Sequence, residues 1–108
     1  MANPQLPHLQ RRLYTGSFRA LVPLAAPNTI VLSDDAFGRA SLYIKNTSAS
    51  LCWIAFGQSD AEGLGYPLEP NDSVSFPYPD NCPVDRVVAT AESADVTLAI
   101  IVVRYSQH

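Results

Sequence analysis

Hydrophobic residues of this chain fall in short runs that are separated by proline and glycine. The runs recur roughly ten residues apart, as in small all-β proteins, and nine prolines and five glycines punctuate them. The β-branched and aromatic residues sit in these runs, and no window shows the 3.6-residue period of an amphipathic helix. The pattern predicts an all-β domain, either a small antiparallel β-sandwich or a jelly-roll-like barrel.

Seven segments are predicted to be strands, namely 11–23, 29–33, 40–46, 51–57, 73–77, 84–92 and 96–105. Residues 33–40 are read as a loop. The segment 40–46 alternates cleanly, so that Leu42 and Ile44 should point inward. The segment 51–57 is apolar on both faces, which predicts a strand that is central or covered on both sides.

The last predicted strand, 96–105, is also apolar on both faces. One face belongs in the core, and the second face needs another cover: the N-terminal segment, a bulge-shifted strand or another subunit. The alternative is a central strand in a tightly curled barrel. We take Ile101 and Val103, on the second face, as candidate contacts with a partner.

Composition and charge strengthen the expectation of a partner. The 108 residues suit a single domain, and charged residues make up only 16%, below the roughly 25% usual for soluble domains. Residues 1–27 carry three basic and no acidic residues, whereas residues 28–108 carry four basic and ten acidic ones, which gives +3 and −6 and a net charge of −3.

A basic, proline-containing N-terminal arm on an acidic body suits contact with an acidic partner or with a second copy. The predicted contacts in this arm and first strand are Leu6, Leu9, Arg11, Arg12 and Phe18. An ordinary solvated N-terminus explains the same pattern equally well. Nucleic-acid binding is disfavoured, because the acidic body would repel phosphate.

No signal peptide or membrane-spanning run is visible in the sequence. Cys52 lies in an apolar run, where a buried free thiol is the commoner outcome, so we expect no disulfide with Cys82.

Catalytic, metal-binding and cofactor-binding residues are not found, so the sequence predicts a protein that is not an enzyme. His8 and His108 lie in the tails, and there is no CxxC motif or phosphate loop. The acid-containing stretches 59–63, 70–72 and 79–81 leave calcium open as an alternative, although such residues are more often turn formers.

A carbohydrate site is a further alternative, because four aromatic residues could form a platform on which a sugar ring stacks: Tyr43, Trp53, Tyr66 and Tyr78. Trp53 reads as a core residue because it lies between Cys52 and Ile54. Tyr66 and Tyr78 remain the candidate ligand-contacting aromatics, and a carbohydrate-binding β-sandwich module remains an alternative function.

Residues 43–102 resemble a recurring module of small tailed-bacteriophage virion proteins. The resemblance rests on a turn at Asn46, a strand ending in Phe56–Gly57, the turn Leu68–Glu69–Pro70–Asn71–Asp72–Ser73, and the segments Val74 to Phe76 and Val87 to Val102. The module usually has glycine where this chain has Asn71. Asparagine tolerates the positive φ that the third residue of a type II turn requires, so the turn should be preserved.

The resemblance implies a structural virion protein, and specifically a capsid decoration (cement) or head-fibre protein. Its partner would be the major capsid protein, with the chain itself forming a dimer or trimer, and it would reach the virion surface after assembly in the host cytoplasm. The alternative within the structural class is a tail, baseplate or fibre-associated protein.

Overall fold

The computed structural model describes residues 13–34, 38–76 and 82–105. Four predicted partner contacts, Leu6, Leu9, Arg11 and Arg12, lie outside these residues, as does Tyr78. The described chain forms eight strands and one short helix: β1 (Leu13–Val22), β2 (Thr29–Leu32), β3 (Arg39–Asn46), β4 (Cys52–Phe56), α2 (Ala61–Leu64), β5 (Tyr66–Leu68), β6 (Ser73–Phe76), β7 (Val87–Ala91) and β8 (Val96–Tyr105). The predicted all-β class is confirmed.

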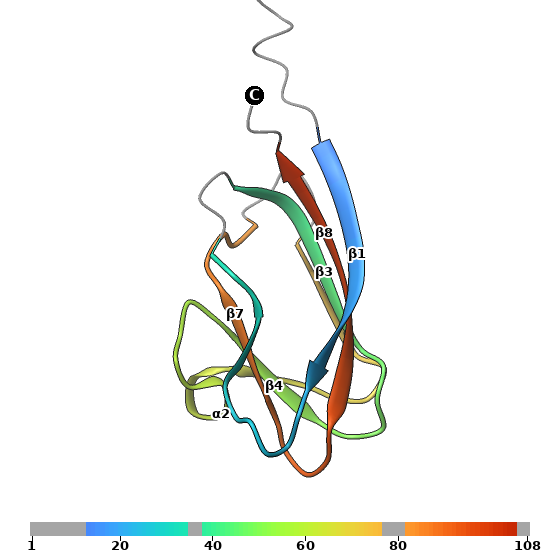
Figure 1. The fold of residues 1–108 in the computed structure, drawn as a ribbon, viewed down its shortest axis with the longest axis vertical. Coiled ribbons are helices and arrows are strands. Elements are labelled where there is room, and N and C mark those ends of the chain that lie inside the picture. Colours follow the sequence, from blue (N-terminus) through green and yellow to red (C-terminus); the bar gives the residue numbers. More distant parts are fainter. Residues whose placement is uncertain (1–12, 35–37, 77–81, 106–108) are drawn as a thin grey trace, which may run out of the picture.

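The strands form two antiparallel four-stranded sheets that pack face to face (Figure 1). Sheet A has the order β1-β8-β3-β6, and sheet B has the order β2-β7-β4-β5. Only the connection from β4 to β5 stays within one sheet, and every other connection crosses between the two. Eight strands wound in this way form a jelly-roll type of β-sandwich, as the hydrophobic pattern predicted.

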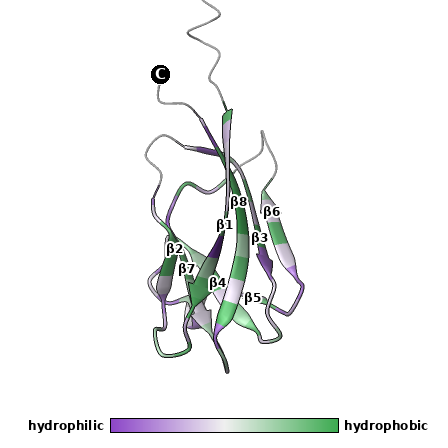
Figure 2. Cartoon of the chain, turned by 45° about the vertical axis from the view of Figure 1, so that its right-hand side comes forward, coloured by the Kyte–Doolittle hydropathy of each residue, from purple (hydrophilic) through white to green (hydrophobic). Residues whose placement is uncertain are grey.

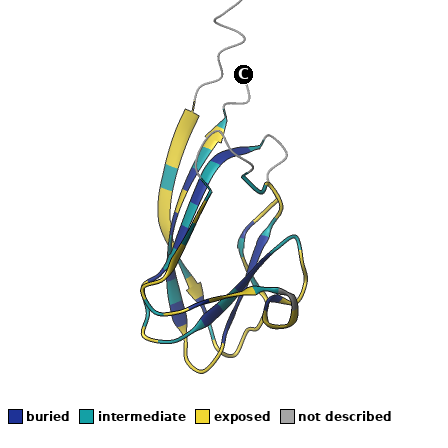
Figure 3. Ribbon diagram, turned by 180° about the vertical axis from the view of Figure 1, so that it is seen from behind, coloured by how far each residue is buried: buried dark blue, intermediate teal, exposed yellow. Residues whose placement is uncertain are grey.

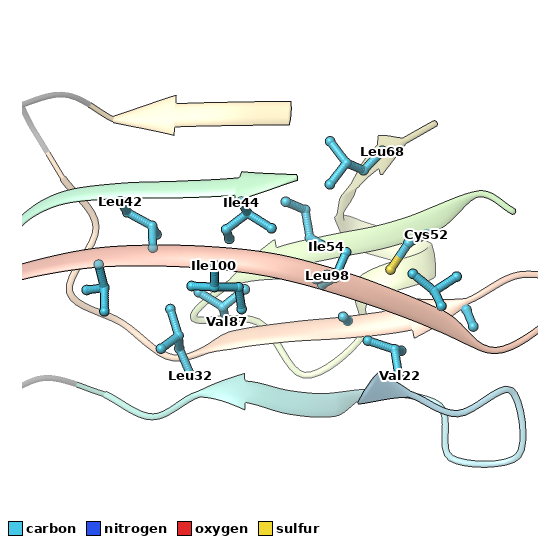
Figure 4. Packing of buried hydrophobic residues seen from close by; sticks show 14 residues of the cluster. Val22, Leu32, Leu42, Ile44, Cys52, Ile54, Leu68, Val87, Leu98 and Ile100 are labelled. Carbon is cyan, nitrogen blue, oxygen red and sulfur yellow. The ribbon is translucent and has the colours of Figure 1, made fainter. Parts of the chain in front are cut away.

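The core lies between the two sheets and is filled by the inward side chains of the strands of both sheets (Figure 4). Leu42 and Ile44 of β3 point into it as predicted and are almost fully buried. They meet Ile54 and Leu68 of sheet B and Leu98 and Ile100 of β8. Burial of these aliphatic side chains, at roughly 25 cal/mol per Å² of apolar area, is the main force that holds the sheets together.

Strand β4 is covered on both faces, which confirms the prediction for this segment. Its inner face joins the core, and on its outer face Ala55 packs with Val88 of β7 and Ala61 of α2. Trp53 packs against this second, outer cluster. The reading of Trp53 as a core residue holds only in part: it is half-buried against this outer cluster and not between the sheets, because side chains along a strand alternate between faces and its neighbours Cys52 and Ile54 point inward.

The helix α2 and strand β5 lie between the predicted strands 51–57 and 73–77, in a stretch for which the sequence predicted no helix or strand. Asp60 caps α2 by accepting a 3.0 Å hydrogen bond from the Gly63 N–H. Gly65 connects the two elements. This position requires glycine, because a Cβ would collide with the carbonyl oxygens of Ala61 and Ile54. Both elements are too short for a periodic hydrophobic signal.

The loop between β1 and β2 is tied to α2 by one side chain. Asn28 has a positive φ of 59°, and its Oδ1 accepts hydrogen bonds from the Ala61 N–H at 2.9 Å and from the Thr90 hydroxyl at 3.0 Å. Its own N–H donates to Thr90 Oγ1 at 2.8 Å. Asn28 thus fixes the helix against the outer side of sheet B.

Candidate interaction surface

The outer face of sheet A is the surface on which the structure places the predicted contacts Ile101 and Val103. Strand β8 buries Val96, Leu98, Ile100 and Val102 on its inner side. On its outer side Val103 is half-buried and Ile101 is 40% exposed. Strand β1 pairs with β8 along its edge and does not lie over it (Figures 2 and 3). The described part of the N-terminal segment therefore leaves this face open.

Neighbouring strands extend this face on either side of β8. Residues directly opposite one another in an antiparallel pair point to the same side. Ile101 is flanked by Tyr43 of β3 and Ser17 of β1, and Ala99 is flanked by Lys45 and Arg19. The outer face of sheet A comprises Leu13, Thr15, Ser17, Arg19 and Leu21 of β1, Thr97, Ala99, Ile101, Val103 and Tyr105 of β8, Ser41, Tyr43 and Lys45 of β3, and Ser73 and Ser75 of β6.

Charge is distributed unevenly over the described chain. All of its acidic residues lie outside the strands, in turns, loops or α2: Asp34, Asp60, Glu62, Glu69, Asp72, Asp85, Glu92 and Asp95. The charged residues within its strands are all basic: Arg19, Arg39, Lys45 and Arg104. The outer face of sheet A consequently combines apolar side chains with two cations and no carboxylate.

Phe18, the remaining predicted contact that the structure describes, does not share this face. It lies opposite the buried Ile100, on the inner side of sheet A, and is 39% exposed. Strand β1 is longer than β2, its counterpart at the same side of sheet B, which leaves the middle of β1 incompletely covered (Figure 1). Phe18 therefore belongs to the open edge of the sandwich, not to its outer face.

The described members of the predicted aromatic platform, Tyr43, Trp53 and Tyr66, do not gather on one surface. Tyr66 is 54% exposed and lies on the same side of sheet B as the core residue Ile54, at the edge of the sheet. Trp53 faces the opposite side, where its Nε1–H donates a 2.9 Å hydrogen bond to Glu92. Tyr43 belongs to the outer face of sheet A. These three rings occupy three different surfaces.

The two cysteines are free thiols, as predicted. Burial raises the pKa of the Cys52 thiol to about 11, and a hydrogen bond with the Thr90 backbone offsets only part of this rise. Burial also raises the pKa of Cys82, although the nearby Arg39 guanidinium lowers it in part. A cysteine nucleophile needs a depressed pKa, so neither thiol is activated for catalysis.

Within residues 13–34, 38–76 and 82–105, no three His, Cys, Asp or Glu side chains come together as metal ligands would. Both histidines lie outside these ranges. In the same residues, no helix is long and apolar enough to cross a membrane.

Arg39 is a structural cation that the sequence did not reveal. It is 3% exposed, and its Nη1 donates 2.8 Å hydrogen bonds to the carbonyls of Pro83 and Asp85, while Nη2 donates to the Ser33 carbonyl at 2.6 Å. It therefore joins the loops that flank β3 and β7. The register shift between Arg39 and Ser41 turns the side chain inward, and a bulge of this kind leaves no signal in the hydrophobic pattern.

The turn that carries the family resemblance has the predicted geometry. Asn71 has a φ of 68°, and the Asp72 N–H donates to the Glu69 carbonyl at 2.9 Å, which closes a four-residue turn. Asn46 is fully buried beside it and accepts from the Asn71 N–H at 2.8 Å. The stretch serves to join β5, β6 and β3, and its acids lie on the surface.

Comparisons with known proteins identify the fold. No protein-family model and no curated protein sequence matches the chain. A solved structure of Bacillus endospore appendages, described as a novel family of disulfide-linked pili, is 21% identical with a TM-score of 0.59, and the match covers 92% of each chain. A cupin-superfamily sugar phosphate isomerase from Silicibacter pomeroyi is 16% identical with a TM-score of 0.54; that match covers 87% of this chain but only 57% of the isomerase. The chain thus shares a small jelly-roll-like β-sandwich fold with proteins of different functions.

Proposed function

We propose that this chain is a structural subunit that joins a larger protein assembly through the outer face of sheet A, and that the assembly is the capsid of a tailed bacteriophage, which the chain decorates. The observation that carries the proposal is the exposed apolar and cationic character of this face, centred on Ile101. Contiguous exposed apolar residues rimmed by polar ones mark interaction sites, and Ile101 lies on this face beside Tyr43 and Val103, with serine, threonine, lysine and arginine around them.

The chemistry of the face specifies the partner surface. Arg19 and Lys45 flank Ala99 and would meet carboxylates, while Ile101 and Tyr43 supply apolar area. A decoration protein stabilises a shell by burying surface on neighbouring capsid subunits, so that opening the shell must also break its contacts. Each contact is modest, at roughly 25 cal/mol per Å² of apolar area, but a lattice repeats it many times.

A binding assay on capsids tests this proposal. Labelled protein is mixed with particles from which the chain has been removed, and the bound fraction is measured after sedimentation. Ile101→Asp should weaken binding at least about tenfold, because it places a carboxylate on an acid-free face that meets carboxylates. Ile30→Asp is the matched control, since Ile30 is 58% exposed on sheet B. Equal binding by the two variants would refute docking through this face.

A second candidate is the subunit of an extracellular filament, which the similarity to the endospore appendage structure over 92% of both chains favours. Negative-stain electron microscopy of the purified chain separates the candidates. Filaments formed by the chain alone support this second candidate, whereas discrete particles that require capsids for assembly support decoration.

A further inference from the structure

Strand β1 presents the longest open strand edge of the described molecule. It runs for ten residues and pairs with β8 in continuous register from Leu13 to Val22, with no bulge and no proline. No other described strand pairs with its second edge. The outward N–H and C=O groups of such an edge form a ready template for another strand.

The other three sheet edges are protected against strand addition. Strand β6 has four residues, and β5 has three, of which one is Pro67. Strand β2 has four residues and a register shift between Ile30 and Leu32. Short strands, prolines and bulges are the devices by which sheets block edge pairing. The open edge of β1 has none of them.

Exposed hydrophobic side chains also concentrate on β1. Nine large hydrophobic side chains are exposed in the described part of the chain, and four of them belong to this strand: Leu13 at 46%, Tyr14 at 54%, Phe18 at 39% and Leu21 at 59% (Figure 3). They lie on both sides of the sheet, Leu13 and Leu21 outside and Tyr14 and Phe18 inside. A partner that extends the sheet would cover both sets at once, which a partner docked on one face cannot do.

We propose that the open edge of β1 pairs antiparallel with β1 of a second copy, so that the two A sheets join into one eight-stranded sheet across a two-fold axis. The length of β1 favours a second β1 as its partner, because no other edge strand of the described chain has ten residues to pair with it. Charge repulsion does not oppose this pairing. Arg19 is the only charged residue of β1, and the two copies of Arg19 would lie on opposite sides of the two-fold axis and not face each other.

The symmetry places the centre of the strand at the axis. Residues 13–22 have their midpoint between Ser17 and Phe18, and a two-fold axis that passes between the two strands at either position sets that residue opposite its own copy. Facing residues then share a side of the sheet, so the inner faces of both sandwiches stay on one side. The joined sheet also doubles the acid-free outer face that the proposed function uses, although dimer formation by the isolated chain does not depend on that function.

Cysteine cross-linking tests the geometry. Ser17→Cys and Phe18→Cys are each made in the full chain with Cys82→Ser, while Cys52 is left in place because it is buried. Under mild oxidation, at least one variant should form covalent dimers at least about tenfold faster than Ile101→Cys, whose side chain lies on the outer face of the same sheet. Faster cross-linking by Ile101→Cys would show a face-to-face dimer and would overturn the proposal, as would the absence of cross-linking at both central positions.

Sedimentation equilibrium gives a second, independent readout. The full chain should dimerise, and Phe18→Lys should raise the dimer dissociation constant at least about tenfold, because an inward lysine at a sheet edge opposes pairing. Ile30→Lys, on the protected edge of sheet B, should leave it unchanged. A chain that stays monomeric up to about 100 µM, or one in which both variants dimerise equally well, contradicts the proposal.

Discussion

The backbone N–H of Asn71 donates a 2.8 Å hydrogen bond to the backbone carbonyl of Asn46. In the other direction, the Asn46 N–H donates to the Asp72 carbonyl at 2.9 Å. These two bonds join the end of β3 to the turn that opens β6. The two asparagines therefore act as one structural unit, with Asn71 supplying an unusual backbone conformation and Asn46 filling the space behind it.

The left-handed backbone at Asn71 leads to the first prediction. Its φ of 68° costs an ordinary residue roughly 1–2 kcal/mol, whereas glycine adopts it freely. Asn71→Ala should lower the free energy of unfolding by about 1 kcal/mol in urea denaturation. Asn71→Gly is the control and should stay within about 0.5 kcal/mol of the original chain. An equal loss in both variants would show that the asparagine side chain, and not the backbone conformation, matters.

Asn46 should be one of the most sensitive polar positions. It is fully buried, its Nδ2 donates to the carbonyls of Ser50 at 2.7 Å and Leu68 at 2.9 Å, and its Oδ1 accepts from the Ser48 N–H at 2.9 Å. Asn46→Ala removes all three bonds and leaves the Leu68 carbonyl without this donor. We expect a loss of about 3 kcal/mol in unfolding free energy. A loss under about 1 kcal/mol would mean that water replaces the side chain.

Gly65 and Gly16 form a matched pair for substitution by alanine. A Cβ at Gly65 would collide with the Ala61 and Ile54 carbonyls, whereas a Cβ at Gly16 would meet Val102 Cγ1 at 3.6 Å, an ordinary contact. Gly65→Ala should therefore cost at least about 2 kcal/mol. Gly16→Ala should be neutral or stabilise the fold by up to about 1 kcal/mol. Thermal denaturation followed by circular dichroism compares the two, and equal melting temperatures would contradict the packing described around Gly65.

Cys52 should make stability fall at alkaline pH. Its pKa rises from 9.0 to about 11 on folding, so the neutral thiol is the form that the folded state favours. This contribution is fully present below pH 9 and is lost as pH rises from about 9 to about 11, because the unfolded chain ionises first. In denaturant titrations at several pH values, Cys52→Ala should lose less stability over this interval than the original chain does. Identical slopes would show that the thiol is accessible to solvent.

Sequence patterns predicted the parts of the fold that depend on side-chain alternation. Strand β8 was predicted with the bounds that the structure shows, 96–105, because its run is rich in valine and isoleucine, which favour strands. The positive φ of Asn71 was predicted from the glycine that the similar module usually has at this position, together with the tolerance of asparagine for this conformation. Strand β5 was missed because it has only three residues, and its Pro67 argued against a strand.

The candidate surface was predicted only in part, for a physical reason. Alternation placed Ile101 and Val103 on the second face of the last strand, but it could not show which element, if any, covers that face. Nor could it separate Phe18 from them, because the side of the sheet on which Phe18 lies depends on its register with Ile100 in a strand far away in the sequence. Such register is a property of the folded chain.

The central claim, that this chain decorates a capsid, is tested most directly by its copy number in purified virus particles. Quantitative mass spectrometry of particles that contain the chain gives its molar ratio to the major capsid protein. Decoration predicts hundreds of copies per particle, in a fixed ratio to the capsid subunit and lost together with capsid binding in Ile101→Asp. A handful of copies per particle would place the chain in the tail or baseplate, and its absence from particles would contradict the account.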